Sequence, residues 1–191
     1  MTDNLRGKVL WLTRPAGTAG QLAERLVAQG AEVLQVPLLE IRPLAPAEPA
    51  AAAARELARE AASCQHIIFI SGNAVQHGLT YFDAAVWRGV RCYAIGRATA
   101  ELLAAHGIKA RYPAGTAMNS EALLQLPELQ QVAGSKILIV RGIGGREYLA
   151  RALRQRGAQV QYLETYRRIK SDTLPEAIAR RLAEGRIDVI Q

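Results

Sequence analysis

The stretch KILIVRGIGGRE, residues 136–147, decides the fold of this chain. Its apolar run is short, continuous and rich in β-branched residues, which is typical of a strand buried on both faces of a parallel sheet. An arginine and a glycine-containing turn follow, and residues 145–156 then show the apolar spacing of an amphipathic helix. Gly157 is placed to end that helix, and a second strand is predicted at 159–163. The stretch therefore indicates a strand–turn–helix–strand unit.

The same pattern occurs near the N-terminus. Residues 7–33 align without gaps on residues 134–160 (134 − 7 = 127, the constant offset). The coincident positions include an arginine, three glycines and several apolar residues, among them Arg14 on Arg141, Gly7 on Gly134, Gly17 on Gly144, Gly30 on Gly157 and Leu26 on Leu153. All units of this kind share apolar positions, but a coincident arginine and glycines are not general. We interpret the two segments as an internal duplication.

Short apolar runs alternate with helical patterns along the whole chain, which is typical of parallel sheets covered by helices. We predict an α/β fold of two doubly wound, flavodoxin-like lobes. The predicted strands are 8–13, 32–36, 66–70, 91–95, 109–112, 136–140, 159–163 and 187–190. The predicted helices are 18–29, 50–62, 73–79, 97–106, 120–125, 145–156 and 174–184.

Two extended stretches follow the duplicated segments and are predicted to join the lobes. Residues 38–43 and 164–169 would form a two-stranded hinge, with lobe 1 made of 1–37 plus 170–191 and lobe 2 of 44–163. Lobe 1 then has only three strands, and the last one stops at Gln191 inside an apolar run. A sheet edge left unfilled in this way is unusual. We therefore expect lobe 1 to be incomplete and the sequence to lack a C-terminal part.

The composition of the chain narrows the class of ligand that we expect it to bind. The net charge of +7 favours an anionic ligand, but aromatic residues make up only 5% and the basic residues are dispersed, so we expect a small polyanion and no nucleic acid. No apolar run approaches the about 20 residues that span a bilayer, and the N-terminus lacks a signal-peptide pattern. Cys64 and Cys92 lack metal-ligand spacing. A cytoplasmic protein without a metal is predicted.

Ligands of open α/β sheets bind at the carboxyl ends of strands, near helix N-termini. The candidates at such positions are Arg14, Ser71, Asn73, Thr99, Arg141, Gly142, Gly144, Gly145 and Arg146. Four of them have a plainer alternative: a structural ion pair for the two strand-end arginines Arg14 and Arg141, and helix capping for Ser71 and Thr99. A dinucleotide fingerprint starting at Gly142 would need glycine where the chain has Glu147, which argues against a pyrophosphate.

Taken together, the motifs resemble those of the uroporphyrinogen-III synthase family. The resemblance covers the whole chain in order. The segments that carry it are VLWLTRP at 9–15, PLLEI at 37–41, ISGNAV at 70–75, AIGRATA at 94–100, SEALL at 120–124, ILIVRG at 137–142 with Arg146 and Glu147, and YRR at 166–168. Family members are similar to the predicted architecture, with two α/β lobes, a two-stranded hinge and a cleft.

The resemblance implies an activity. The chain would be a cofactor-independent lyase that cyclises hydroxymethylbilane to uroporphyrinogen III, with loss of water and inversion of ring D. That linear tetrapyrrole carries acetate and propionate groups, so it is a small polyanion. By the same resemblance, Tyr166 would be catalytic and assist the departure of the hydroxyl group, unless it is only a hinge residue packed between lobes. We expect a monomer. The alternative is a non-catalytic two-lobed binding module for a small polyanion.

Overall fold

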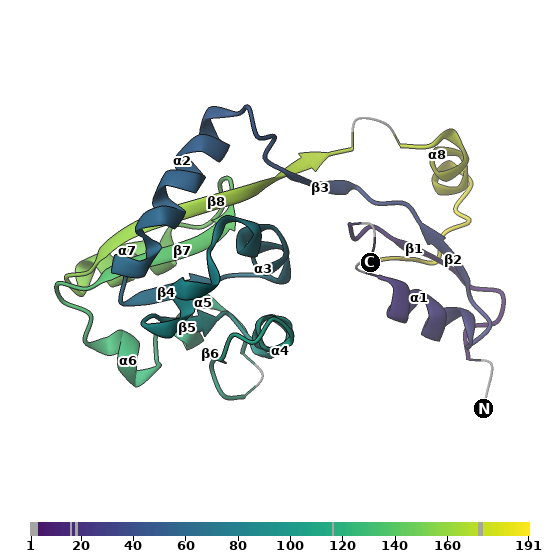
Figure 1. Ribbon diagram of the computed structural model, residues 1–191. Coiled ribbons are helices and arrows are strands. Elements are labelled where there is room, and N and C mark those ends of the chain that lie inside the picture. Colours follow the sequence, from purple (N-terminus) through teal and green to yellow (C-terminus); the bar gives the residue numbers. More distant parts are fainter. Residues whose placement is uncertain (1–3, 16, 18, 116, 172–173) are drawn as a thin grey trace. The chain divides into compact units, whose positions relative to one another are not determined.

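The structure is a computed structural model that describes residues 4–15, 17, 19–115, 117–171 and 174–191 (Figure 1). The chain divides into two compact units. The smaller unit is Met1–Arg42 with Arg168–Gln191, and the larger unit is Pro43–Arg167. The predicted lobe boundaries fall within about five residues of these divisions. Within the described ranges, no helix combines the length and the apolar character that crossing a bilayer requires.

The larger unit is built on parallel strands in the order β8-β7-β4-β5-β6. The strands are β4 (His66–Phe69), β5 (Arg91–Ala94), β6 (Ala110–Arg111), β7 (Lys136–Gly142) and β8 (Gln159–Lys170). Its α-helices are α2 (Pro49–Arg59), α3 (Gly72–Gly78), α4 (Arg97–Ala105), α5 (Ser120–Leu123), α6 (Pro127–Gln130) and α7 (Tyr148–Gln155). Short 3-10 turns occupy Glu60–Ser63, Leu79–Tyr81 and Ala84–Arg88. The α/β prediction is confirmed.

Both faces of this sheet are covered, as continuous apolar strands require. On one face, Ile68 and Ile139 pack with buried leucines of α5, α6 and α7. Side chains alternate along a strand, so Phe69 and Val140 point to the other face. There α3 lies so close that a Cβ on Gly78 would come within 2.6 Å of Val140. Because α3 packs this closely on β7, the loop that leads into α3 is held near the end of β7.

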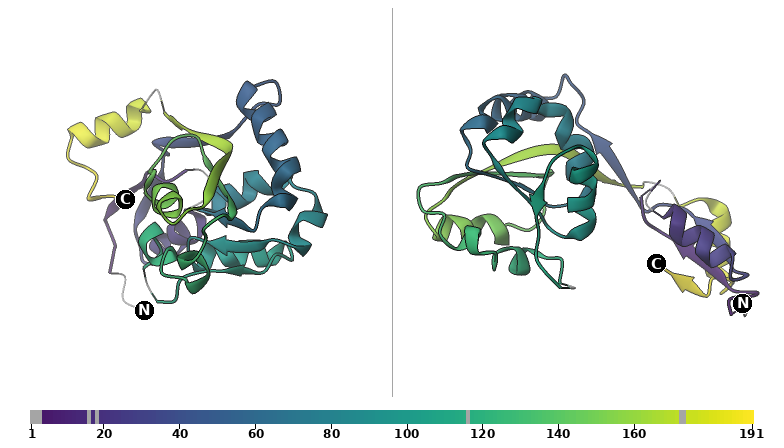
Figure 2. Two further views of the ribbon diagram at one scale, coloured as in Figure 1. Left: turned by 90° about the vertical axis from the view of Figure 1, so that its left-hand side faces the viewer. Right: turned by 60° about the horizontal axis from the view of Figure 1, so that its bottom comes forward.

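The smaller unit is a three-stranded parallel sheet in the order β2-β1-β9. Its elements are β1 (Val9–Leu12), α1 (Gly20–Val27), β2 (Glu32–Gln35), α8 (Glu176–Ala183) and β9 (Val189–Ile190). Figures 1 and 2 show the yellow C-terminal elements beside the purple N-terminal ones within this unit. Thr18, at which we predicted α1 to begin, lies outside the described residues.

The duplicated segments have the same strand register. Val9 pairs with Glu32 in the smaller unit, and Lys136 pairs with Gln159 in the larger one, each 127 positions later. The three coincident glycine pairs all have positive φ, between 73° and 87°, a region that disfavours other residues. The likeness extends to the third strand, because β9 lies beside β1 as β4 lies beside β7. The structure thus agrees with the interpretation of a duplication.

The two connecting stretches are strands, but they differ in extent from the prediction. Residues 164–169 do not form a separate hinge strand; they belong to β8, which runs without a break from 159 to 170. The other stretch is β3 (Leu39–Pro43), the neighbour of β8. Leu44 N–H donates to Thr165 and Ser171 N–H donates to Leu38. Residue numbers in β3 therefore rise where those of β8 fall, so the two strands run antiparallel.

Candidate active site

The carboxyl ends of the strands in the larger unit gather most of the predicted site residues. Ser71 follows β4, Thr99 lies in the first turn of α4 after β5, and Gly142 ends β7. Tyr166 lies on β8 opposite Gly142. Parallel strands end at one edge of a sheet, which is where α/β proteins bind ligands. The larger unit therefore presents a candidate site of its own at this edge.

Tyr166 is the centre of the site. Its side chain is completely buried, and its hydroxyl lies 3.1 Å from Ser71 Oγ. Ser71 also caps α3, because its Oγ accepts a hydrogen bond of 3.0 Å from the Ala74 N–H. The capping role left open for Ser71 is thus present, and it coexists with the contact to Tyr166. Both residues of this contact belong to the larger unit.

A bulge in β8 brings Tyr166 to this position. Arg141 pairs with Glu164, but Gly142 pairs with Tyr166 instead of Thr165, so the register shifts by one residue. Bulges of this kind redirect side chains near functional sites. The tyrosine ring then lies against Gly142, where an added Cβ would come within 2.6 Å of a ring carbon. Gly142 is needed here for space, and the structure gives no direct support for its predicted ligand contact.

His77 completes the surroundings of Tyr166, and it was not predicted from the sequence. Its ring centroid lies 5.6 Å from that of Tyr166. Burial lowers the pKa of His77, which favours the neutral imidazole. His77 also lines a cavity of about 290 Å³ together with Arg55, Tyr81 and Thr165. A histidine six residues after Ser71 gives no recognisable motif; only the packing of α3 reveals it.

Arg141 is held by the protein itself. Its side chain is 3% exposed, and its Nε donates to the Gly142 carbonyl at 3.1 Å while Nη1 lies 3.1 Å from Glu147 Oε1. The guanidinium also lies over the Tyr162 ring, 4.5 Å from its centroid. The structural ion pair left open for Arg141 is therefore observed. These contacts join the end of β7 to the start of α7, whereas a substrate contact of Arg141 stays a prediction.

Glu147 is the second member of this network. Its Oε2 accepts a hydrogen bond of 2.5 Å from the Tyr162 hydroxyl. That bond, and next the guanidinium of Arg141, lower the pKa of the Glu147 carboxyl. The residue that spoils the dinucleotide fingerprint thus anchors the glycine loop to a neighbouring strand.

The remaining predicted residues of the larger unit occupy different environments. Thr99 is buried within α4, whose N-cap is Gly96, so the capping alternative for Thr99 is wrong. Asn73 is half-buried in the first turn of α3. Gly144, Gly145 and Arg146 form an exposed turn, and the Gly144 N–H lies 3.4 Å from a Glu164 oxygen. Ligand contacts at these positions remain predictions.

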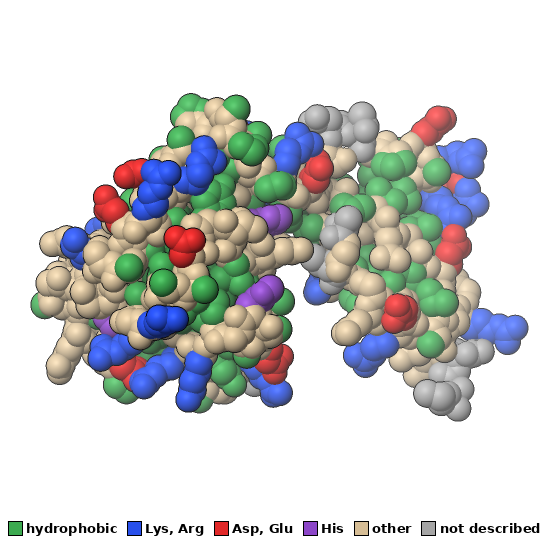
Figure 3. Space-filling model, viewed as in Figure 1, with side chains coloured by type: hydrophobic (Ala, Val, Ile, Leu, Met, Phe, Trp, Pro, Cys, Tyr) green, Lys and Arg blue, Asp and Glu red, His purple; other side chains and the backbone are tan. Residues whose placement is uncertain are grey.

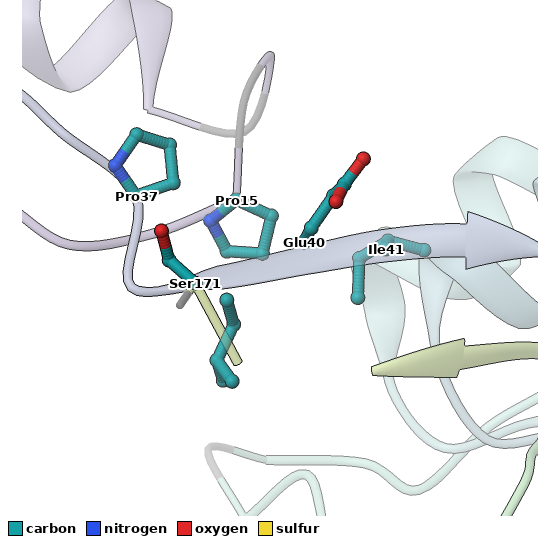
Figure 4. Close-up of a pocket in the computed structure, with 6 residues that line it drawn as sticks. Pro15, Pro37, Glu40, Ile41 and Ser171 are labelled. Atoms are coloured by element: carbon teal, nitrogen blue, oxygen red, sulfur yellow. The ribbon is translucent and has the colours of Figure 1, made fainter. Parts of the chain in front are cut away.

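Arg14 lies at the corresponding edge of the smaller unit and is exposed there. Arg14 and Arg141 hold equivalent places in the two duplicated segments, but their side chains differ, because that of Arg14 is exposed and that of Arg141 is buried. A hollow of about 430 Å³ lies nearby within the same unit, lined mainly by Pro15, Pro37, Leu39 and Ile41 with Glu40 and Ser171. Figure 4 shows Pro15, Pro37 and Ser171 gathered beside β3.

Charge at the surface is mixed. On the face shown in Figure 3, lysine and arginine side chains are dispersed among acidic ones. Among the described residues, no three histidine, cysteine, aspartate or glutamate side chains are grouped in a way that could hold a metal ion. The buried thiols Cys64 and Cys92 do not pair with each other, and burial raises the pKa of Cys92 to about 12.

Comparison with known proteins decides the family. The family described as "Uroporphyrinogen-III synthase HemD" matches residues 20–191. This chain belongs to the uroporphyrinogen-III synthase family. The uroporphyrinogen-III synthase of Proteus mirabilis is 34% identical over 191 residues, covering 94% of this chain and 89% of the relative. That of Salmonella typhimurium is 40% identical over 164 residues, covering 82% of this chain but 63% of the relative.

Solved structures agree with this assignment at the level of the fold. A mutant uroporphyrinogen III synthase from the extremely thermophilic bacterium Thermus thermophilus superposes with a TM-score of 0.68 at 21% identity. The superposition covers 96% of this chain and 71% of that chain. The family prediction made from the motifs is therefore confirmed, and the family's enzymes are cyclising lyases of tetrapyrrole biosynthesis.

Proposed function

We propose that this protein cyclises hydroxymethylbilane to uroporphyrinogen III, with loss of water and inversion of ring D, and that Tyr166 is its catalytic residue. The observation that carries the role of Tyr166 is its contact with Ser71. A tyrosine hydroxyl can supply a proton to a departing hydroxyl group, directly or through a neighbouring hydroxyl. This hydroxyl is held 3.1 Å from a serine at the carboxyl edge of the sheet, where α/β enzymes act.

The proposed reaction needs the substrate to be held in one conformation, and it needs assistance at one step, the loss of the terminal hydroxyl group. Loss of the terminal hydroxyl gives a reactive azafulvene, which the substituted carbon of ring D attacks to give a spiro intermediate that then fragments and recloses. Without an enzyme the chain closes unturned, to the type I isomer. No metal or cofactor enters these steps. Catalysis would rest mainly on positioning, with the basic excess of +7 favouring the polyanionic substrate.

We further propose that the two units are two lobes of one enzyme, joined by β3 and β8 as the hinge strands. Support comes from the paired connecting strands and from the carboxyl edge that each unit presents. Arg14, Asn73, Thr99 and the turn at 144–146 would then contact substrate carboxylates. The binding module without catalysis, the alternative raised by the sequence, has no observation that favours it.

The role of Tyr166 is tested by removing only its hydroxyl. Tyr166→Phe keeps the ring against Gly142, so we expect turnover of hydroxymethylbilane to fall at least several-fold while the urea unfolding midpoint stays close to that of the unmodified protein. Tyr112→Phe is the matched control, since Tyr112 is 41% exposed on the surface. Equal turnover in both variants would remove Tyr166 from the mechanism.

A further inference from the structure

We infer that Ser71 is a second catalytic residue, which passes a proton from the Tyr166 phenol to the departing hydroxyl group of the substrate. This inference rests on the proposed cyclase function and deepens it. It begins from the burial of Tyr166, whose side chain has no exposed surface. Ser71 is partly exposed at the start of α3 and lies 3.1 Å from the phenol oxygen. Ser71 is thus a neighbour of the phenol that lies open to a bound substrate.

The hydrogen bonds of Ser71 support this proton relay from Tyr166 to the substrate. A serine hydroxyl has two acceptor lone pairs and one proton to donate. One lone pair accepts from the Ala74 N–H at 3.0 Å, which fixes the oxygen at the helix N-terminus. When the Tyr166 phenol donates into the second lone pair, the acceptor capacity of Ser71 is filled. Its own proton is then the one available to a substrate oxygen at this edge.

The reaction takes up one proton at the leaving hydroxyl group and releases one from ring D, and the Tyr166–Ser71 pair can carry both. The carbon–oxygen bond of the hydroxymethyl group breaks with its electron pair going to oxygen, and that oxygen takes the Ser71 proton to leave as water. Ser71 takes the phenol proton at the same time, which leaves a phenolate and, because the pyrrole N–H is kept, the protonated, cationic form of the azafulvene. When ring D recloses at its unsubstituted carbon, that carbon loses a proton. This proton returns through Ser71 to Tyr166, and the site is restored without any further reactant.

The packing around the pair holds both oxygens in place. Gly142 gives the ring the space that a Cβ would fill, and His77 lies against the ring from the last turn of α3. The same helix carries Ser71 at its start. One helix therefore fixes the serine oxygen and the ring, and this is the preorganisation that a proton relay needs.

A double-mutant cycle separates a relay from two independent contacts. In a relay, Ser71→Ala and Tyr166→Phe each interrupt the same transfer. We expect each variant to lower kcat by a similar factor, with KM within about twofold, and the double variant to be no slower than the slower single one. Ser71→Thr keeps the hydroxyl and should restore most of kcat. Factors that multiply in the double variant would overturn the relay.

Two controls separate a loss of catalysis from a loss of stability. Ser63→Ala makes the same change at an exposed position before β4, at the opposite end of that strand from Ser71, and should leave kcat unchanged. Urea unfolding of each variant reports how much stability the cap contributes, separately from kcat. If the unmodified protein forms no type III isomer, the proposed function fails. If it forms that isomer and the two losses multiply, the relay alone fails.

Discussion

At the scale of single residues, the candidate site depends on Gly142, which lies against the ring of Tyr166. Gly142→Ala would place a methyl group 2.6–2.7 Å from two ring carbons of Tyr166, so the ring or β7 must shift. We expect a stability loss of about 1–3 kcal/mol and a clear loss of turnover. Gly89→Ala is the control, because nothing lies within 4 Å of its added Cβ and its φ is negative. Urea unfolding and turnover are the measurements. Unchanged values for Gly142→Ala would contradict the packing described.

Two histidines of the larger unit predict how stability depends on pH. Burial is the main cause that lowers the pKa of His66 and of His77 in the folded state. The unfolded chain then binds more protons, so the stability contribution is full above pH about 6.5 and is lost as the pH falls through the folded values. We expect the unfolding free energy to decrease from pH 7 to 5. Replacing both histidines by glutamine should flatten this decrease, and an undiminished slope would refute its origin in these residues.

At the scale of elements, the connection between β7 and α7 is predicted to be held by Arg141. Arg141→Met removes bonds to the Gly142 carbonyl and to Glu147, and we expect a stability loss of about 1–3 kcal/mol. Arg146→Met changes an exposed arginine of the same turn and should cost almost nothing. The urea unfolding midpoints of the two variants decide the matter. Equal midpoints would mean that Arg141 does not hold this connection.

The sequence predicted the duplicated elements because their glycines have backbone requirements that packing cannot replace. Gly30 and Gly157 both end a helix with positive φ, and the strands they lead into share one register. The different burial of Arg14 and Arg141 could not be predicted in this way. It depends on residues that arrive from other elements. Glu147, Tyr162 and Glu164 surround Arg141, whereas the corresponding positions 127 residues earlier hold Gly20, Gln35 and Pro37, which offer no carboxylate or aromatic ring.

The length of β8 and the place of His77 were missed for a related reason. Residues 164–169 are predicted as a separate hinge because they form a short extended stretch directly after a duplicated segment, yet pairing with β7 and β3 continues the strand. The bulge that turns Tyr166 toward Gly142 leaves no mark in the sequence. Local patterns therefore predict which strand ends carry the candidate residues, and only the tertiary packing shows which of these side chains lie together.

At the scale of the whole molecule, the proposed function is decided by the isomer that the protein makes. Hydroxymethylbilane closes by itself to the unturned product, so formation of any type III isomer reports inversion of ring D directly. The measurement is the ratio of type III to type I product after incubation with the purified protein, set against the same substrate without protein. We predict that type III dominates with the protein and is absent without it. Type I alone in both samples would contradict the proposed function.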